Sequence, residues 1–147
     1  MLKFSVETLG VYPDHFSQNY VFDLRDGTLL KIDDLIVKTK DYNIYDSLYN
    51  INKIKLEQEL ANIKRSDDST DIDYVKEKVE ESINDKTAVD FYISNDTLFF
   101  IHKPAGFPHE MRAYEMDFET FYSFDDIQPH FSNRGKSILL RRKKNYR

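Results

Sequence analysis

The sequence predicts an α+β fold, a single domain in which a small antiparallel sheet carries two amphipathic helices packed on one face. Strand-like patterns occur towards both ends of the chain, whereas helical periodicity is confined to the middle. Helices that are grouped in this way, rather than alternating with strands, favour an antiparallel sheet over a parallel one. The length of 147 residues suits one hydrophobic core.

The first predicted element is a β-hairpin in the segment Asn19–Ile36, which reads NYVFDLRDGTLLKIDDLI. Its first residues alternate as in a half-buried strand, with Tyr20, Phe22 and Leu24 on one side and Val21 and Asp23 on the other. RDGT then supplies the aspartate and glycine that a tight reversal favours, and LLKI resumes the apolar run.

The aspartates of this segment are interpreted as structural residues. A calcium loop of the EF-hand type needs oxygen ligands at alternating positions, a glycine at the sixth position and an acid at the twelfth. That spacing is not met by Asp23, Asp26, Gly27, Asp33 and Asp34. We expect Asp26 to form the turn and Asp33 to be the N-cap of a short helix that contains Leu35.

Two amphipathic helices are predicted next. Apolar residues recur at helical spacings over residues 43–65, and the intervening residues are polar. SDDSTD then interrupts the pattern. Thr70 and Asp73 resemble a capping box, which starts a second helix that ends near Asn84.

Strands return after the helices. AVDFYISNDTLFFIH contains two β-rich runs joined by Asn95 and Asp96, a pair that tolerates the left-handed backbone of a two-residue hairpin loop. Beyond a proline-containing loop, MRAYEMDFETFY predicts another strand. SFDDIQPHF predicts a short capped turn of helix that Pro129 breaks.

The net charge of −5 is unevenly distributed along the chain. Seven of the 21 basic residues lie in the acid-free segment Asn133–Arg147, so the rest carries 14 bases against 26 acids, a net charge of −12. We predict one domain over residues 1–133 and a basic C-terminal tail over 134–147. The tail is interpreted as a solvated end, with a nucleic-acid or anionic-lipid arm, or a last strand formed by KSILL, as alternatives.

Common catalytic and metal-binding motifs are absent from the sequence. It has no HExxH, no glycine-rich phosphate loop, no GxSxG and no cysteine, so no catalytic residue, cofactor or metal ion is predicted. One alternative is enzymatic: His102 and His109 could converge with Lys103 into a base, acid and cation set of a small hydrolase or nuclease.

Acids and aromatic residues interleave from Gly106 to Phe131. Such a pattern is typical of a protein-binding surface with aromatic anchors and steering charges, although a strand with one core face and one solvated face also produces it. An acidic surface attracts a basic protein and repels nucleic acid. The predicted partner-binding residues are Phe107, Glu110, Glu115, Asp117, Glu119, Tyr122, Asp125 and Asp126.

Three stretches, VFDLRDGTLLKIDDLI, FYISNDTLFFIH and YEMDFETFYSFDDIQPHF, together with PHE between the last two, resemble the RsiV-like C-terminal domain family over roughly residues 19–131. That family occurs outside the membrane in lysozyme-sensing anti-sigma factors and in some peptidoglycan deacetylases. The resemblance implies a small antiparallel sheet with helices across it. It also implies that the following residues specify the fold and are not catalytic: Phe22, Asp23, Leu24 and Gly27.

These observations predict a non-enzymatic bacterial protein that binds a basic partner. An immunity protein, which neutralises a basic toxin or hydrolase by occluding its active site, is the expected function. Because no apolar run could span a bilayer and no export signal is recognised, we expect no membrane span and a cytoplasmic location. The alternative, which the resemblance implies, is an extracytoplasmic sensor or a cell-wall-associated domain.

Overall fold

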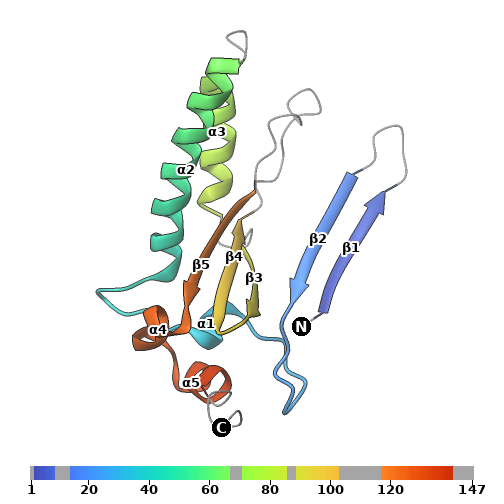
Figure 1. The fold of residues 1–147 in the computed structure, drawn as a ribbon, viewed down its shortest axis with the longest axis vertical. Helices are drawn as coiled ribbons and strands as arrows, with labels where there is room; N and C mark the ends of the chain where they lie inside the picture. The colour runs from blue at the N-terminus through green and yellow to red at the C-terminus, as the bar shows by residue number, and fades with distance from the viewer. Residues whose placement is uncertain (1, 9–13, 67–70, 86–88, 103–116, 141–147) are drawn as a thin grey trace. The chain divides into compact units, whose positions relative to one another are not determined.

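The computed structural model describes residues 2–8, 14–66, 71–85, 89–102 and 117–140, which form the predicted α+β fold (Figure 1). Strands β1 (Leu2–Thr8) and β2 (Asp14–Tyr20) pair in one antiparallel sheet. A second antiparallel sheet has the strand order β3-β4-β5, with β3 at Val89–Ser94, β4 at Thr97–His102 and β5 at Phe118–Ser123. The helices are α1 (Ile32–Leu35), α2 (Ile44–Ser66), α3 (Ile72–Ile83), α4 (Phe124–Ile127), the 3-10 helix η3 (Gln128–His130) and α5 (Asn133–Leu139).

The described residues belong to two compact units, which we treat separately. Unit 1 contains the described residues of 1–42, 91–99 and 121–147, and unit 2 contains those of 43–90 and 100–120. None of the helices in the described part of the chain is both long enough and apolar enough to cross a bilayer.

The core of unit 2 lies between α2, α3 and the first residue of β5. Its buried residues are Leu56, Leu60, Val75, Val79, Ile83 and Phe118. Phe118 of β5 therefore packs against both helices, because their apolar residues share one face of each helix. Lys55 of α2 also contacts β5, where it donates hydrogen bonds to the backbone carbonyl of Glu119 and to the Thr120 hydroxyl.

The predicted helix boundaries are confirmed, but the residue that caps the second helix differs from the predicted one. Helix α2 begins and ends one residue after the predicted positions. The side chain of Asp71 accepts a hydrogen bond from the backbone N–H of Tyr74 (3.0 Å), so Asp71 caps α3. Thr70, which was expected to cap this helix, lies outside the described residues.

The hairpin between β3 and β4 turns at the predicted residues. Asn95 and Asp96 have φ angles of 47° and 57°, so both loop residues adopt the left-handed conformation. Two consecutive residues of this kind give the loop a twist that matches the twist of the flanking strands. The predicted hairpin is therefore confirmed.

The segment Asn19–Ile36 forms a shorter hairpin than predicted. The bridge that closes this hairpin joins Phe22 to Leu29. It is flanked by hydrogen bonds from the Asp23 N–H to the Thr28 carbonyl (2.9 Å) and from the Leu30 N–H to the Val21 carbonyl (2.8 Å). The preceding strand, β2, ends at Tyr20 and pairs with β1, a pairing that the sequence pattern does not predict.

The turn residues of this segment behave largely as expected. Gly27 has a φ of 73°, and Asp26 accepts a hydrogen bond from the Thr28 N–H (2.9 Å), as a turn-forming aspartate does. The expected cap was wrong, because the N-cap of α1 is Lys31. Asp34 accepts a hydrogen bond from the Lys31 N–H (2.8 Å), whereas Asp33 lies inside the first turn of the helix.

Two elements after β4 agree with the prediction. Strand β5 occupies the described part of MRAYEMDFETFY. The side chain of Ser123 accepts a hydrogen bond from the Asp126 N–H (3.2 Å) and so caps α4, after which Pro129 lies in η3. The capped helical turn of SFDDIQPHF is therefore confirmed.

The expectations for the basic C-terminal segment need correction. Residues 133–139 form α5, so KSILL supplies helical residues rather than a last strand, and the predicted boundary at residue 134 falls inside a helix. Ser132 caps α5 through the Gly135 N–H (2.8 Å) and donates to the Asp34 carbonyl (2.5 Å). A Cβ on Gly135 would lie 2.2 Å from the Leu35 carbonyl oxygen, so only glycine lets α5 approach α1 this closely.

Candidate functional site

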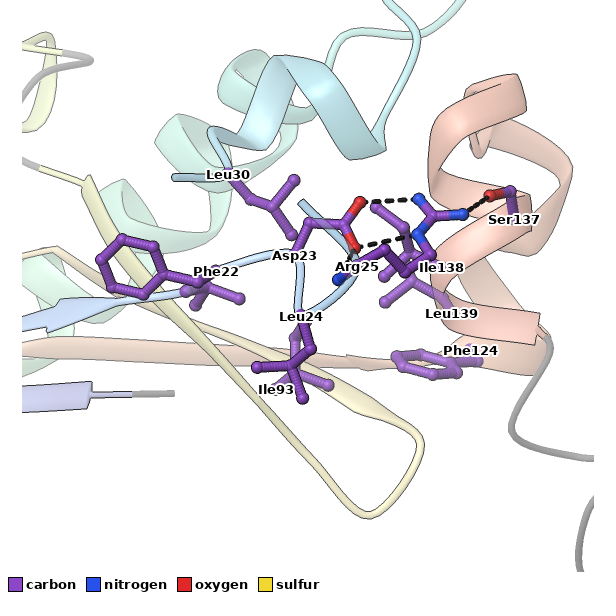
Figure 2. Close-up of a pocket in the computed structure, with 11 residues that line it drawn as sticks. Phe22, Asp23, Leu24, Arg25, Leu30, Ile93, Phe124, Ser137, Ile138 and Leu139 are labelled. Atoms are coloured by element: carbon purple, nitrogen blue, oxygen red, sulfur yellow. Dashed lines mark hydrogen bonds and ion pairs between the residues drawn. The ribbon is translucent and has the colours of Figure 1, made fainter. Parts of the chain in front are cut away.

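The turn after β2 brings a buried carboxylate against a guanidinium in unit 1. Asp23 is 3% exposed, although its neighbour Leu24 is 86% exposed. Arg25 donates from Nε to Asp23 Oδ1 (2.9 Å) and from Nη2 to Asp23 Oδ2 (2.6 Å), a paired arrangement that fixes both side chains. Figure 2 shows this pair, with Arg25 also reaching Ser137 of α5 (2.8 Å).

The electrostatics of this cluster favour the ionised carboxylate. The hydrogen bonds from Arg25 hold the pKa of Asp23 well below its usual range, although burial acts in the opposite direction. Arg134 of α5 adds to the effect, because its guanidinium lies 3.7 Å from Asp23 and 3.6 Å from Asp26. The cluster therefore joins the turn to α5 and holds as many positive as negative charges.

A cavity of about 250 Å³ lies beside the Asp23–Arg25 pair (Figure 2). Most of its lining is apolar and comes from the turn, β3, α4 and α5, including Leu24, Leu30, Ile93, Phe124 and Leu139. The donors that Arg25 directs to Asp23 and Ser137 are already used within the protein. We therefore interpret the pair as a clamp between the turn and α5, and not as a catalytic dyad.

A second feature of unit 1 is a row of aromatic rings across the β3-β4-β5 sheet, which we call the aromatic ladder: Tyr92, Phe99 and Phe121. The rings of Tyr92 and Phe99 are stacked, with centroids 4.6 Å apart and an interplanar angle of 4°. Phe121 follows at 5.9 Å from Phe99, with its ring tilted by 39°. Phe121 is 67% exposed, so the ladder ends in an apolar ring that faces solvent.

Carboxylates lie at the end of the sheet that follows Phe121. Asp125 and Asp126 are in the first turn of α4, and both are exposed. The backbone N–H of Phe124 donates to the Asp96 carbonyl (2.8 Å), which brings the β3-β4 turn to the start of α4. Because Asp96 is also exposed, three acidic residues border this end of the sheet.

The predicted partner-binding residues fall into three groups. Phe107, Glu110 and Glu115 lie outside the described residues. Asp117 and Glu119 are exposed in unit 2, and Asp125 and Asp126 are exposed in unit 1.

Tyr122, the predicted aromatic anchor on β5, is half-buried, and burial raises its pKa. The exposed aromatic residue of this strand is its neighbour, Phe121. The alternation of buried Phe118 and Thr120 with exposed Glu119 and Phe121 is the signal that distinguishes them.

The predicted histidine pair is only half described. His102 is 2% exposed and lines a cavity of about 300 Å³ in unit 2, together with Tyr45, Asp46 and Tyr49 of α2. His109 and Lys103 lie outside the described residues, so of the three predicted residues only His102 is described. His130 of unit 1 instead stacks on Tyr42, with ring centroids 3.5 Å apart.

Among the described residues, no group of three or more histidine or acidic side chains is arranged to hold a metal ion. Comparison of the chain with models of protein families, with curated proteins and with solved structures gives no match.

Proposed function

We propose that this protein is a non-enzymatic binding module that recognises a basic partner protein and inhibits it by occlusion, as an immunity protein does. The observation that carries the proposal is the exposed Phe121 ring on β5, the strand that leads directly into exposed Asp125 and Asp126 of α4. Binding surfaces commonly combine an aromatic anchor with charged residues at the rim, because the ring supplies apolar contact area while the charges steer the encounter.

The charge of the chain supports a basic partner. Acidic residues outnumber basic ones by 26 to 21 over the whole chain, and by 26 to 14 before Asn133. The described acids among the predicted partner-binding residues are all exposed. Their carboxylates would meet the cationic substrate groove of a nuclease or another hydrolase, and the protein would then block that groove sterically.

Affinity capture from extracts of the source cells tests this function. We expect a basic protein to be retained at low salt and released as salt rises, because the Debye length falls from about 10 Å at 0.1 M to about 3 Å at 1 M. The captured protein should lose its own activity when one equivalent of this protein is added. Retention that does not change with salt, or a captured protein that keeps its full activity, would contradict the proposal.

A matched pair of variants separates this surface from general acidity. Asp125→Asn with Asp126→Asn removes two charges from the exposed residues of the predicted site in unit 1. Glu59→Gln with Glu77→Gln removes two charges from exposed positions on α2 and α3. The first pair should weaken binding by roughly 3- to 30-fold, corresponding to a few tenths to about 1 kcal/mol for each charge pair. Equal weakening by both pairs would show that only the net charge matters.

A further inference from the structure

We propose that the aromatic ladder is the contact surface for an arginine side chain of the partner, whose guanidinium stacks on the ring of Phe121. This inference rests on the proposed function, since it takes the partner to be a basic protein. It adds the surface that makes the contact and the side chain that the surface prefers.

The geometry of the ladder leaves one position open for stacking. Tyr92 and Phe99 lie almost parallel, so each ring covers a face of the other. Phe121 meets Phe99 on one side and belongs to β5, the last strand in the sheet order. A ring that remains 67% exposed in this position has most of its surface available to a planar group that would extend the row.

The neighbouring charges favour a cation over a neutral planar group. The face of an aromatic ring carries partial negative charge and attracts a cation within about 6 Å of its centroid. Asp96 and Asp125 are exposed at the end of the sheet that follows Phe121, so their negative charges favour a cationic group there. One oxygen of Asp126 already accepts a hydrogen bond from the Ser123 hydroxyl (2.6 Å).

Arginine fits this combination better than lysine does. A guanidinium is planar, stacks on aromatic faces and presents several N–H donors in its own plane, so it can stack on Phe121 and bond a carboxylate simultaneously. An ammonium is compact and more strongly hydrated, and it lacks a flat face. The surface should therefore distinguish two basic side chains of equal charge.

The experiment compares two synthetic nonapeptides, one alternating glycine with arginine and the other alternating glycine with lysine. Binding to the full chain is followed by NMR titration of the aromatic ring signals. We expect the arginine peptide to bind about 2- to 5-fold more tightly, which corresponds to roughly 0.5 to 1 kcal/mol for an exposed cation–π contact. We also expect the largest shifts in the signals of Phe121 and Phe99.

Two variants test which group produces the preference. Phe121→Leu keeps an apolar side chain but removes the aromatic face, and it should make the two peptides bind equally. Ile54→Ala is the matched control, because Ile54 is 61% exposed on α2 in the other unit, and it should leave the preference unchanged. The double variant Asp96→Asn with Asp125→Asn should weaken the binding of both peptides. Asparagine is suitable at residue 96 because it tolerates the positive φ of that position.

The outcomes separate this inference from the proposed function. Equal affinity of the two peptides for the unchanged protein overturns the arginine site, as does a preference that survives Phe121→Leu. If the captured basic partner binds Phe121→Leu normally and is still inhibited, the arginine site is wrong, and the proposed inhibition then rests on the acidic charge alone. If aromatic shifts appear with a neutral oligosaccharide and with neither peptide, the ladder is a sugar platform and the inference is wrong.

Discussion

Asp23 is an acidic residue in a buried position, with only 3% of its surface exposed. An ionised aspartate is seldom buried unless it is paired. Here two N–H groups of the Arg25 side chain and the Arg25 backbone N–H satisfy its carboxylate, and Arg134 lies within 4 Å. Only two positions separate Asp23 from Arg25, so the pair forms within one turn and then holds α5 through Ser137.

Asp23→Asn should therefore lower the thermal stability of the protein by several degrees at pH 7. Asparagine has a similar shape but cannot form the charged pair with Arg25. Asp33→Asn is the matched control, because Asp33 is an exposed acid of the same segment, and it should shift the melting temperature little. Thermal unfolding followed by circular dichroism measures both changes, and equal shifts would show that the Arg25 pair does not stabilise the fold.

The effect of Asp23→Asn should also depend on pH. The pKa of Asp23 is lowered in the folded state, so its contribution to stability is complete above the ordinary carboxyl pKa, near 3.8, and declines as pH falls towards the lower folded-state value. The difference in melting temperature between Asp23→Asn and the unchanged protein should accordingly narrow between pH 6 and pH 3. A difference that stays constant over this range would contradict the assigned role of the charge.

Among the described secondary-structure elements, α5 is the one whose packing is not evident from the charge pattern of the sequence. Its basic residues suggest a solvated tail, yet Leu139 and Gly135 are buried and its first turn bonds α1. The short α1 and α5 fix one another through backbone groups of Leu35, Asp34 and Ser132. This contact depends on the absence of a side chain at residue 135.

Gly135→Ala should destabilise the protein by about 1 to 3 kcal/mol, as expected for an overpacked contact. The sign of this change in stability is informative, because alanine normally stabilises a helix interior relative to glycine by roughly 0.5 to 1 kcal/mol. Here the added Cβ would collide with the Leu35 carbonyl oxygen. Chemical denaturation of Gly135→Ala, compared with Lys136→Ala at an exposed position of α5, measures the difference. A stabilising effect of Gly135→Ala would show that α5 does not approach α1 this closely.

At the scale of the whole molecule, local sequence patterns predict local structure well and long-range contacts poorly. The helix boundaries and the Asn95–Asp96 loop follow from periodicity and φ preference, which neighbouring residues determine. The docking of α5 depends on residues 98 positions apart, which no periodicity reports. The pairing of β1 with β2 joins neighbouring segments, but the polar residues of DHFSQNY give only a weak strand pattern. For the candidate site, interleaved acids and aromatics pointed to β5, but only the burial of that strand shows that Phe121, and not Tyr122, is its exposed ring.

Truncation tests the extent of unit 1. A chain that ends at Ser132 retains the predicted domain almost entirely but loses α5, Arg134 and Ser137. We expect such a chain to show weaker protection of the Asn19–Ile36 amides in hydrogen exchange than a chain that ends at Leu140. Equal protection in the two chains would support the domain boundary at residue 133 that the sequence predicts, and would contradict a structural role for α5.

The bond between Ser132 and Asp34 joins positions that are 98 residues apart, and the bond between Arg25 and Ser137 joins positions 112 apart. During synthesis, the early partners leave the ribosome long before the late ones exist. The contacts that bury Leu30, Leu35 and Ile36 therefore form only after α5 has been synthesised. The helices of unit 2 rely on nearer contacts and can form earlier. In the growing chain, the apolar residues of this early segment are therefore exposed to chaperones until α5 has been synthesised.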